Sequence, residues 1–584
     1  MKWKKYLPVL DWGSSYNRQF FKGDLIAGLT VCVMLVPQGM AYSMLAGMPP
    51  IYGLYGGLIP LFLYGILGTS RQLSLGPVAI DALLILAGIS QIAEPGSQTY
   101  IELVILTGLL VGVCQFLLGR LRMGFLVNFL SHPVIVGFTS AAAIIIAVSQ
   151  LKYLFGFSIP RFSHSYETVA YAFSHLSDIH WLSFGICVGG IALMIILRKI
   201  SRAIPGALIV TILGILLAWF FQLDTQGLQV VGEVPRGLPH FVAPVFDLAS
   251  IRAVLPTVFT VTVIGIVESI GIARVLEAKN KDGQVRPNQE LLALGISKIG
   301  GAFFQAIPSS ASFTRSAIND DAGAKTGMAS IITALGIGLT LMLLTSLFYY
   351  LPEAILASII LMAVRSLFDW KEALHLWRTH RHDFAMMMIT FVLTLIVGIE
   401  KGVLIGVVLS IIMIVYRTAI PHIAVLGKLP DSGHYRNVTR FPEAIQDDNI
   451  LIIRFDAQLF FGNAEYFKNT IQEMTQHRED QLDLLVLDAT SINDVDSSGM
   501  HTLEEVHEYL TDRSIQLYMA NVIGPVRDNM FKTGLMEKIG REHFFLSIES
   551  ALQDFKSETE GSSEHWTSKA VQTNVKGRKS KGAQ

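Results

Sequence analysis

Long apolar segments joined by short polar connections fill the first 420 residues of this chain. Several windows hold about 20 apolar residues with few charges, the length that a helix needs to cross the hydrocarbon core of a bilayer. Of the 584 residues, 52% are hydrophobic and 16% are charged. We therefore predict a polytopic helical membrane protein. The predicted segments are 25–46, 50–68, 75–92, 101–119, 132–151, 182–198, 205–222, 253–276, 290–305, 314–324, 328–350, 353–367, 383–399 and 402–419.

The carboxyl-terminal part of the chain has a different composition. Residues 421–584 hold 42 of the 91 Asp, Glu, Lys and Arg residues. Stretches typical of strands occur at 449–456, 482–489 and 514–520, with patterned helices near 464–478, 499–511 and 525–539, which predicts a small α/β domain. We expect a lead-in over 1–23, a membrane domain over 24–420, a soluble domain over 421–556 and a disordered tail over 557–584.

The short connections predict how the chain is oriented, because basic residues favour the cytoplasmic side. One set of connections, on the side of the N-terminus, is rich in Lys and Arg, whereas the other set holds little beyond Lys152, Arg161, Arg236 and Lys401. We therefore expect a multi-pass protein of the cell (inner) membrane with a cytoplasmic N-terminus and soluble domain. The basic set consists of Lys2, Lys4, Lys5, Arg120, Arg122, Arg198, Lys199, Arg202, Arg274, Lys279, Lys281, Arg286, Arg365, Lys371, Arg378 and Arg381.

Two predicted segments, 75–92 and 314–324, are short or polar. Each is the third element of a seven-segment half, about 24–222 and 253–420, and because seven is odd the second half would be inverted relative to the first. Interrupted segments at matching positions in two halves point to the binding site of a transporter. The two stretches are "GTSRQLSLGPVAIDALL" (68–84) and "AIPSSASFTRSAINDDAG" (306–323), in which Ser, Thr, Gly or Pro precedes a short helix. In two inverted halves the N-termini of these helices would face each other, and their free N–H groups and partial positive charges would favour an anion.

Several other functions are disfavoured by the sequence. The net charge of -1 gives no field that would attract nucleic acid. The three cysteines lie in apolar segments without metal or redox spacing, which indicates packing. The segments contain no metal-ligand cluster, nucleophile–base pair or phosphate-binding loop, so we expect no cofactor, no metal and no enzymatic activity.

Several motifs resemble the SulP sulfate-permease family of anion transporters, over about residues 10–555. These are "VPQGMAYSMLAGMPPIYGLY" (36–55), "GTSRQLSLGP" (68–77), "NQELLALG" (288–295) and "SFTRSAINDDAGAKT" (312–326). "VLGKLPDSGHY" (425–435) and "LDATSINDVDSSGMHTL" (487–503) resemble the junction and core of a cytoplasmic STAS domain. The resemblance implies two inverted seven-helix repeats divided into core and gate domains, a homodimer, and transport of sulfate, bicarbonate, chloride or dicarboxylates.

Arg315 is the first candidate substrate residue, because a charge in a membrane segment is costly unless it has partners or a water-filled cavity. It would bind the anion together with the neighbouring hydroxyls and backbone N–H groups; alternatively it reaches the surface or pairs with a carboxylate.

The resemblance places Gln38, Tyr42 and Thr314 beside the substrate, although Gln38 and Tyr42 also fit a buried polar pair near Pro37. Ser74, Gly76, Pro77 and Val78 would begin the facing half-helix. The candidate substrate-binding residues are Gln38, Tyr42, Ser74, Gly76, Val78, Ser312, Thr314, Arg315 and Ser316.

Two carboxylates are candidates for coupling. Glu268 matches a family carboxylate linked to cation coupling, and an apolar environment favours its neutral form, so it is a candidate proton carrier; alternatively it forms a static ion pair. Asp81 departs from the family pattern and would pair with Arg315, bind Na+ or face a polar crevice without a specific role. Glu290 begins a helix, where its charge suits the helix dipole.

The function that these observations favour is a proton-coupled symporter of sulfate or a similar oxyanion, working by alternating access. The alternatives are a Na+-coupled bicarbonate symporter, a proton-coupled dicarboxylate symporter, an uncoupled exchanger or channel, and a membrane sensor that signals through the soluble domain. In that domain Asp496, Ser497 and Ser498 are candidate regulatory residues at a strand-to-helix turn, where a partner or phosphate would act. The alternative for these three residues is ordinary helix capping.

Overall fold

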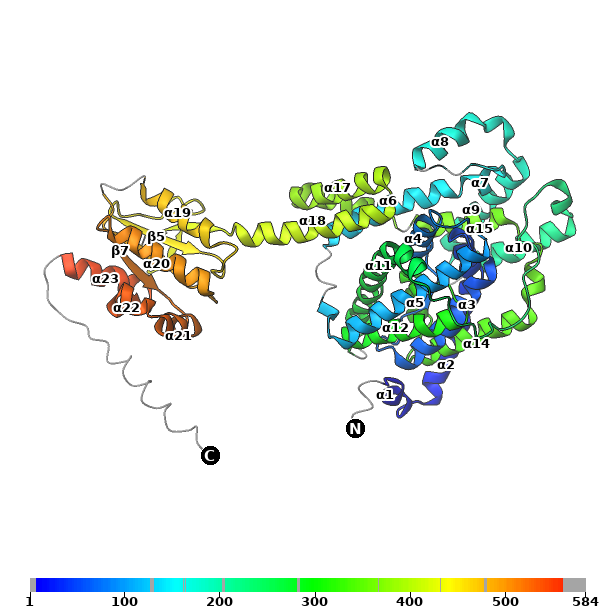
Figure 1. Ribbon diagram of the computed structural model, residues 1–584, viewed down its shortest axis with the longest axis horizontal. Coiled ribbons are helices and arrows are strands. Elements are labelled where there is room, and N and C mark those ends of the chain that lie inside the picture. The colour runs from blue at the N-terminus through cyan, green and yellow to red at the C-terminus, as the bar shows by residue number, and fades with distance from the viewer. Residues whose placement is uncertain are drawn as a thin grey trace. The chain divides into compact units, whose positions relative to one another are not determined.

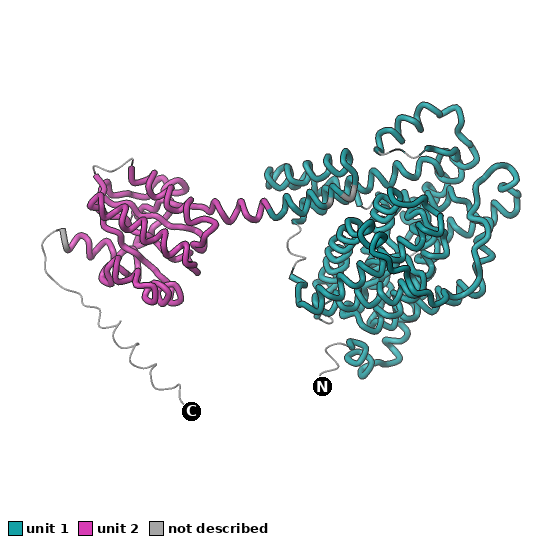
Figure 2. Tube along the Cα trace, viewed as in Figure 1, with its two compact units in different colours: residues 1–411 teal, residues 412–584 magenta. Residues whose placement is uncertain are grey.

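The computed structural model describes residues 7–125, 131–160, 162, 164–201, 205–280, 284–365, 367–430, 432–476 and 481–559. The chain divides into two compact units, residues 1–411 and 412–584 (Figure 2). The disordered tail predicted from residue 557 does not begin there, because a helix continues through Thr559. The rest of that tail, residues 560–584, lies outside the described residues.

Each predicted membrane segment corresponds to a helix (Figure 1). Within the part of the chain that the structure describes, six helices are long and apolar enough to cross a membrane by length and composition, and several shorter apolar helices accompany them. Short additional helices are α1 (Val9–Gly13), α7 (Leu151–Phe155), α8 (Ser165–Ser174) and α16 (Trp370–Thr379). The helices of the segments are α2 (Arg18–Leu45), α3 (Pro50–Leu67), α4 (Ala79–Ile89), α5 (Gln98–Arg120), α6 (His132–Ser149), α9 (Trp181–Ile200), α10 (Gly206–Phe220), α11 (Leu248–Asn280), α12 (Pro287–Phe303), α13 (Phe313–Asp321), α14 (Met328–Leu343), α15 (Glu353–Val364), α17 (Arg381–Val397) and α18 (Ile399–Ala419).

The helices of the first unit form two groups. Helices α2, α3, α4, α5, α11, α12, α13 and α14 pack mainly on one another, whereas α6 packs on α17, and α9 packs on α10 and α15. Small residues allow the closest approaches: a Cβ at Gly295 of α12 would lie 2.5 Å from the backbone nitrogen of Phe116 on α5. Glycine at a helix crossing lets two backbones approach closely, as is common in membrane proteins. The two groups agree with the predicted core and gate domains.

The second unit contains a six-stranded sheet in the order β4-β3-β5-β6-β7-β8, in which β5 to β8 are parallel and β3 is antiparallel to both its neighbours. The three predicted strands are confirmed as β5, β6 and β7. Strand β3 was not predicted, because its apolar residues closely follow the last membrane segment and continue the same hydrophobic run. The strands are β3 (Ile423–Lys428), β4 (Tyr435–Asn437), β5 (Ile450–Phe455), β6 (Leu484–Asp488), β7 (Gln516–Ala520) and β8 (Phe544–Phe545).

Helices cover both faces of this sheet (Figure 1). In β5, Leu451, Ile453 and Phe455 pack with α19 (Ala464–Gln476), α20 (Ser497–Thr511), α21 (Gly524–Thr533) and α22 (Leu535–Ile539). The alternate residues Ile450 and Ile452 face α23 (Ile548–Thr559), as the two-residue period of a strand requires. The single helix predicted near 525–539 is instead two helices, because Gly534 lies between them with a left-handed φ of 77°.

Candidate functional site

The two interrupted segments meet at a short antiparallel strand pair. Strand β1 (Leu75–Gly76) pairs with β2 (Ser310–Ala311), with Leu75 opposite Ala311 and Gly76 opposite Ser310. Because β1 leads into α4 and β2 leads into α13, the two short helices leave this crossing in opposite directions. The crossing is closed by two hydrogen bonds: the Ser312 N–H donates to the Ser74 carbonyl at 3.2 Å, and the Ser74 N–H donates to Ser316 Oγ at 2.9 Å.

The starts of both short helices have backbone donors that remain free. Ser74, Gly76 and Val78 were expected to begin the facing half-helix, but all three precede α4, which begins at Ala79: Ser74 lies just before β1, Gly76 lies in β1, and Val78 is the extended N-cap. Val78 caps α4 without a side-chain hydrogen bond, whereas Ser312 Oγ caps α13 by accepting from the Arg315 N–H at 3.5 Å. Among the described residues, the N–H groups of Ala79, Ile80, Phe313 and Thr314 have no acceptor. Such donors favour negative charge at the crossing.

Arg315 lies in the first turn of α13, and its side chain is fully buried with 0% exposure. Its Nη1 donates to the Pro77 carbonyl at 3.0 Å, across the crossing from α13. Its Nε and Nη2 are buried and have no hydrogen-bond partner. A Cβ at Gly76 would lie 3.1 Å from Nη2, so the absence of a side chain there leaves room for the guanidinium group. Arg315 therefore does not reach the surface, and it keeps unused donors.

Other predicted substrate residues lie on helix α2 and in the first turn of α13. Gln38 and Tyr42 are buried on α2, and Tyr42 lies within electrostatic range of both Arg315 and Glu268. Ser316 is buried and holds the crossing through its hydroxyl. Thr314 is exposed in this structure, so its side chain is the least enclosed of the predicted substrate residues on α13.

Glu268 lies on α11 and is half-buried, less enclosed than the apolar sequence around it suggested. Its Oε2 is buried without a hydrogen-bond partner. Arg315 interacts with Glu268 electrostatically, but the two side chains form no direct ion pair, so the static pair considered from the sequence is not present. The next residue, Ser269, accepts a hydrogen bond from the Ala311 N–H at 3.2 Å and joins α11 to the crossing.

The cation that acts on Asp81 is Lys298, rather than Arg315, one of the partners considered from the sequence. Asp81 is 1% exposed on α4, and Lys298 is 3% exposed on α12. Both Asp81 oxygens and the Lys298 Nζ lack hydrogen-bond partners and form no direct ion pair with each other, so Lys298 acts on Asp81 and Glu268 electrostatically, without direct contact. The signal that was available is a single lysine inside "LLALGISKIGG" (291–301), a segment otherwise suited to lipid depth.

Two carboxylates bind the chain next to the interrupted segments: Glu290 binds the residues before β1, and Asp24 binds the residues after α13. Glu290 is 1% exposed and accepts hydrogen bonds from Tyr64 Oη at 2.8 Å, from the Thr69 N–H at 2.6 Å, from the Ser70 N–H at 2.8 Å, and from Thr69 Oγ1. Glu290 does lie in the first turn of α12, as the dipole role requires, and in addition it accepts these hydrogen bonds from the start of the third segment. At the end of α13, Asp24 accepts from the N–H groups of Lys325 and Thr326 at 2.6 and 3.0 Å.

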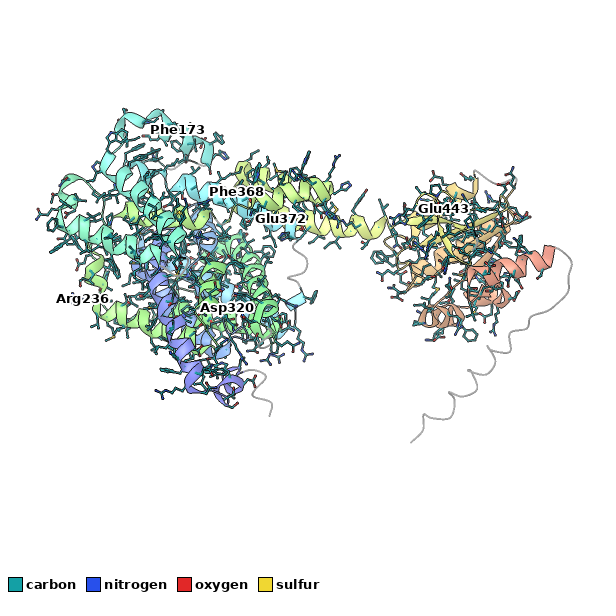
Figure 3. The ribbon with its side chains drawn as sticks, turned by 180° about the vertical axis from the view of Figure 1, so that it is seen from behind. Phe173, Arg236, Asp320, Phe368, Glu372 and Glu443 are labelled. Atoms are coloured by element: carbon teal, nitrogen blue, oxygen red, sulfur yellow. The ribbon has the colours of Figure 1, made fainter. Side chains whose placement is uncertain are left out.

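Helix α13 is also fixed at its carboxyl end by α11. Lys279 Nζ lies 2.7 Å from an oxygen of Asp320, which is labelled in Figure 3, and Asn280 Nδ2 donates to the other oxygen at 2.7 Å. The short helix that carries Arg315 is therefore held at its carboxyl end by side chains of α11, while Ser269 of the same helix holds the preceding strand β2.

In the second unit, Asp496 caps helix α20. Its side chain accepts from the Gly499 N–H at 2.8 Å and from the Phe461 N–H at 3.0 Å. Ser497 and Ser498 lie in the first turn of α20 and are exposed. Asp496 therefore has a capping role in this structure. The regulatory role of the three residues stays a prediction.

Comparison with known proteins gives the same division of the chain. The model of the sulfate permease family matches residues 21–390, and that of the STAS domain matches residues 441–551. Over 567 residues the chain is 39% identical to sulfate transporter 4.1, chloroplastic, of Arabidopsis thaliana, covering 94% of this chain and 82% of the relative. It is 33% identical over 575 residues to high affinity sulfate transporter 2 of Stylosanthes hamata, covering 94% and 86%.

A solved structure supports the same assignment. The murine solute carrier 26 family member A9 anion transporter, in its inward-facing state, superimposes with a TM-score of 0.87 and 26% identity, over 95% of this chain and 94% of that one. The transmembrane domain of a cyanobacterial bicarbonate transporter superimposes with a TM-score of 0.60 at 21% identity, over 66% and 98%, which shows a shared fold only. With matching motifs, a paired half-helix crossing and this similarity, the chain belongs to the sulfate permease family and carries a STAS domain.

Proposed function

We propose that this protein is a secondary active transporter that carries sulfate together with protons across the membrane by alternating access. The observation that carries the proposal is Arg315, a buried cation with two unused guanidinium nitrogens beside two helix N-termini. Relatives at 39% and 33% identity are named as sulfate transporters, which supports this substrate.

The available donors suit a tetrahedral oxyanion. Sulfate has four oxygens and two negative charges, and it accepts hydrogen bonds from guanidinium and from backbone N–H groups at helix starts. Arg315 supplies Nε and Nη2, while Ala79, Ile80, Phe313 and Thr314 supply N–H groups from both helices. We propose that the anion binds between these groups, with Gln38 and Tyr42 on α2 closing one side.

Glu268 is the proposed proton carrier. It is close enough to Arg315 for the two charges to interact, yet its Oε2 has no hydrogen-bond partner. A proton on Glu268 removes the negative charge that competes with the anion for Arg315, so proton and sulfate binding would favour each other. One proton and one dianion then carry one net negative charge. In this proposal alternating access is a movement of the helix group that holds α4 and α13 relative to the second group.

Uptake of labelled sulfate, bicarbonate and succinate into proteoliposomes, each with and without proton and Na+ gradients, tests the proposal. We expect an inward proton gradient to drive sulfate uptake, and a trapped pH dye to report proton entry with sulfate. Glu268→Gln should abolish proton-driven uptake while sulfate still binds to the purified protein. Glu94→Gln is the matched control, because Glu94 is exposed outside the site. If pH-dependent uptake survives in Glu268→Gln, the coupling role is wrong.

The same assay separates the alternatives. Na+-driven bicarbonate uptake would indicate the bicarbonate symporter, and proton-driven succinate uptake would indicate a dicarboxylate carrier. Sulfate-dependent current without proton movement would indicate an uncoupled exchanger or channel. A sensor acting through a regulatory partner of the STAS domain predicts normal transport after deletion of residues 421–584. A homodimer, which the family resemblance implies, is tested by the mass of the purified protein in detergent.

A further inference from the structure

A second group of polar side chains, all buried except the half-buried Glu268, lies beside the proposed anion site. Its charged members are Asp81 on α4, Glu268 on α11 and Lys298 on α12, which interact electrostatically. Its neutral members are Gln115 on α5 and Ser310 on β2. A Cβ at Gly265 would lie 3.0 Å from Ser310 Oγ and 3.3 Å from Gln115 Nε2, so these two groups converge where α11 has no side chain.

Ser310 lies close enough to Asp81 to favour its charged form, but none of these groups makes a hydrogen bond of normal length and angle with the surrounding protein. Both Asp81 oxygens, both amide atoms of Gln115, Glu268 Oε2, Lys298 Nζ and Ser310 Oγ are buried without a hydrogen-bond partner. Carboxylate, amide and hydroxyl oxygens are the ligands that hard cations prefer. Two carboxylates with such neighbours would therefore need a cation, and Lys298 provides one from the chain itself.

We propose that Lys298 is a tethered counter-cation that neutralises Asp81 and thereby makes transport by this protein independent of Na+. The inference deepens the proposed function, since it concerns which cation the site requires. Lys298 and Asp81 come from helices of opposite halves of the membrane domain, and each is almost completely buried. Removing one charge of a buried pair leaves the other uncompensated, whereas removing both restores neutrality. Lys298 is a positioning residue, because it acts on Asp81 and Glu268 rather than on the anion.

The test compares wild type, Lys298→Met, Asp81→Asn and the double variant Asp81→Asn/Lys298→Met in proteoliposomes, with NaCl or choline chloride at constant ionic strength. Wild-type sulfate uptake should be the same in both salts. Lys298→Met should lose uptake by roughly tenfold or more in choline and regain much of it in Na+, because the metal ion restores the missing charge. Asp81→Asn should be impaired in both salts. The double variant should be more active than either single variant and indifferent to Na+.

Thermal unfolding of the purified variants in detergent gives a readout that needs no transport. Na+ should raise the Tm of Lys298→Met, and it should leave wild type and the double variant unchanged. If wild type requires Na+, or if the double variant is as impaired as Lys298→Met in both assays, the inference is overturned. If wild type moves no sulfate under any gradient but Na+ still stabilises Lys298→Met alone, the proposed substrate fails and the role of Lys298 stands.

Discussion

At the scale of single residues, Arg315 is distinguished by how incompletely the protein satisfies it. A buried guanidinium with five N–H donors usually has most of them engaged, yet Arg315 makes one hydrogen bond across the crossing, from Nη1 to the Pro77 carbonyl. Nε and Nη2 stay free. A purely structural arginine would engage these nitrogens, because each unsatisfied buried donor costs about 1–3 kcal/mol. These free donors are the basis of the proposed anion site.

Arg315→Lys is therefore expected to be far from conservative. Lysine keeps the charge but has a compact ammonium group that cannot bond the Pro77 carbonyl and offer two planar donors at once. We expect sulfate affinity to fall by roughly 10-fold or more, since loss of one charge-assisted hydrogen bond is worth about 1.5–3 kcal/mol. Equilibrium binding of labelled sulfate to purified protein measures this. Wild-type affinity in Arg315→Lys would mean that charge alone is sufficient at this position.

A second residue-scale prediction concerns Asp456 in the STAS unit. Burial by itself would raise the pKa of Asp456, but hydrogen bonds from Arg454 (2.5 Å) and His422 (2.8 Å) outweigh it and lower the pKa. A carboxylate with a lowered pKa stabilises the folded state above its unfolded pKa of about 3.9, and this contribution is lost as pH falls through the folded pKa.

Asp456→Asn should consequently destabilise strands β3 and β5 at neutral pH, by about 1–2 kcal/mol. The difference from wild type should shrink as the pH is lowered through the folded pKa. Hydrogen exchange of these two strands in the full-length protein is the measurement. Asp448→Asn is the control, because Asp448 is exposed and its side chain makes no hydrogen bond among the described residues. Equal protection in both variants at neutral pH would contradict the assignment.

At the scale of elements, the sequence predicted the pair of half-helices but not what holds them. Breaks at matching positions, and Ser, Gly and Pro before each short helix, are local signals that can be recognised without a structure. By contrast, the roles of Glu290 and Lys298 depend on their interactions with residues far away in the chain. The position of Glu290 in the first turn of its own helix could be predicted, but its partners Thr69 and Ser70 lie 221 and 220 residues earlier and could not. Lys298 has no local motif at all.

The support of Glu290 leads to a prediction about the entrance of the third segment. Glu290→Ala would leave the N–H groups of Thr69 and Ser70 without their acceptor, and Tyr64 Oη with only the Ser70 carbonyl at 3.4 Å. Because each unsatisfied buried donor costs about 1–3 kcal/mol, we expect a clear fall in Tm together with slower sulfate uptake. Glu290→Gln keeps one carbonyl oxygen and should be intermediate. Glu94→Ala, at an exposed site, is the control. If Glu290→Ala has the same Tm as wild type, the connection that contains Thr69 and Ser70 is held by other contacts.

At the scale of the whole molecule, hydrophobicity and charge predicted most of the architecture. Segment lengths follow from the thickness of the bilayer, so all the predicted membrane segments correspond to helices. Nearly continuous apolar runs in β5, β6 and β7 identified the centre of the STAS sheet, since those strands are buried on both faces. The edge strands β4 and β8 were missed because three- and two-residue strands carry too little pattern to be distinguished from loops. Which side of the membrane each connection occupies rests on charge alone.

That orientation is the last prediction, and the chain is well suited to testing it. The three native cysteines, Cys32, Cys114 and Cys187, are buried or half-buried, so they should react slowly with a bulky maleimide that does not cross membranes. A reporter cysteine at Asp448, in the STAS unit, should be labelled only after intact cells are permeabilised. One at Glu94, in the connection between α4 and α5, should be labelled in intact cells, because that connection lies on the side poor in Lys and Arg. The parent chain measures background labelling by the native cysteines. The reverse pattern would place the STAS unit outside the cell, where the basic connections would also have to lie, and would invert the direction assigned to proton and sulfate entry.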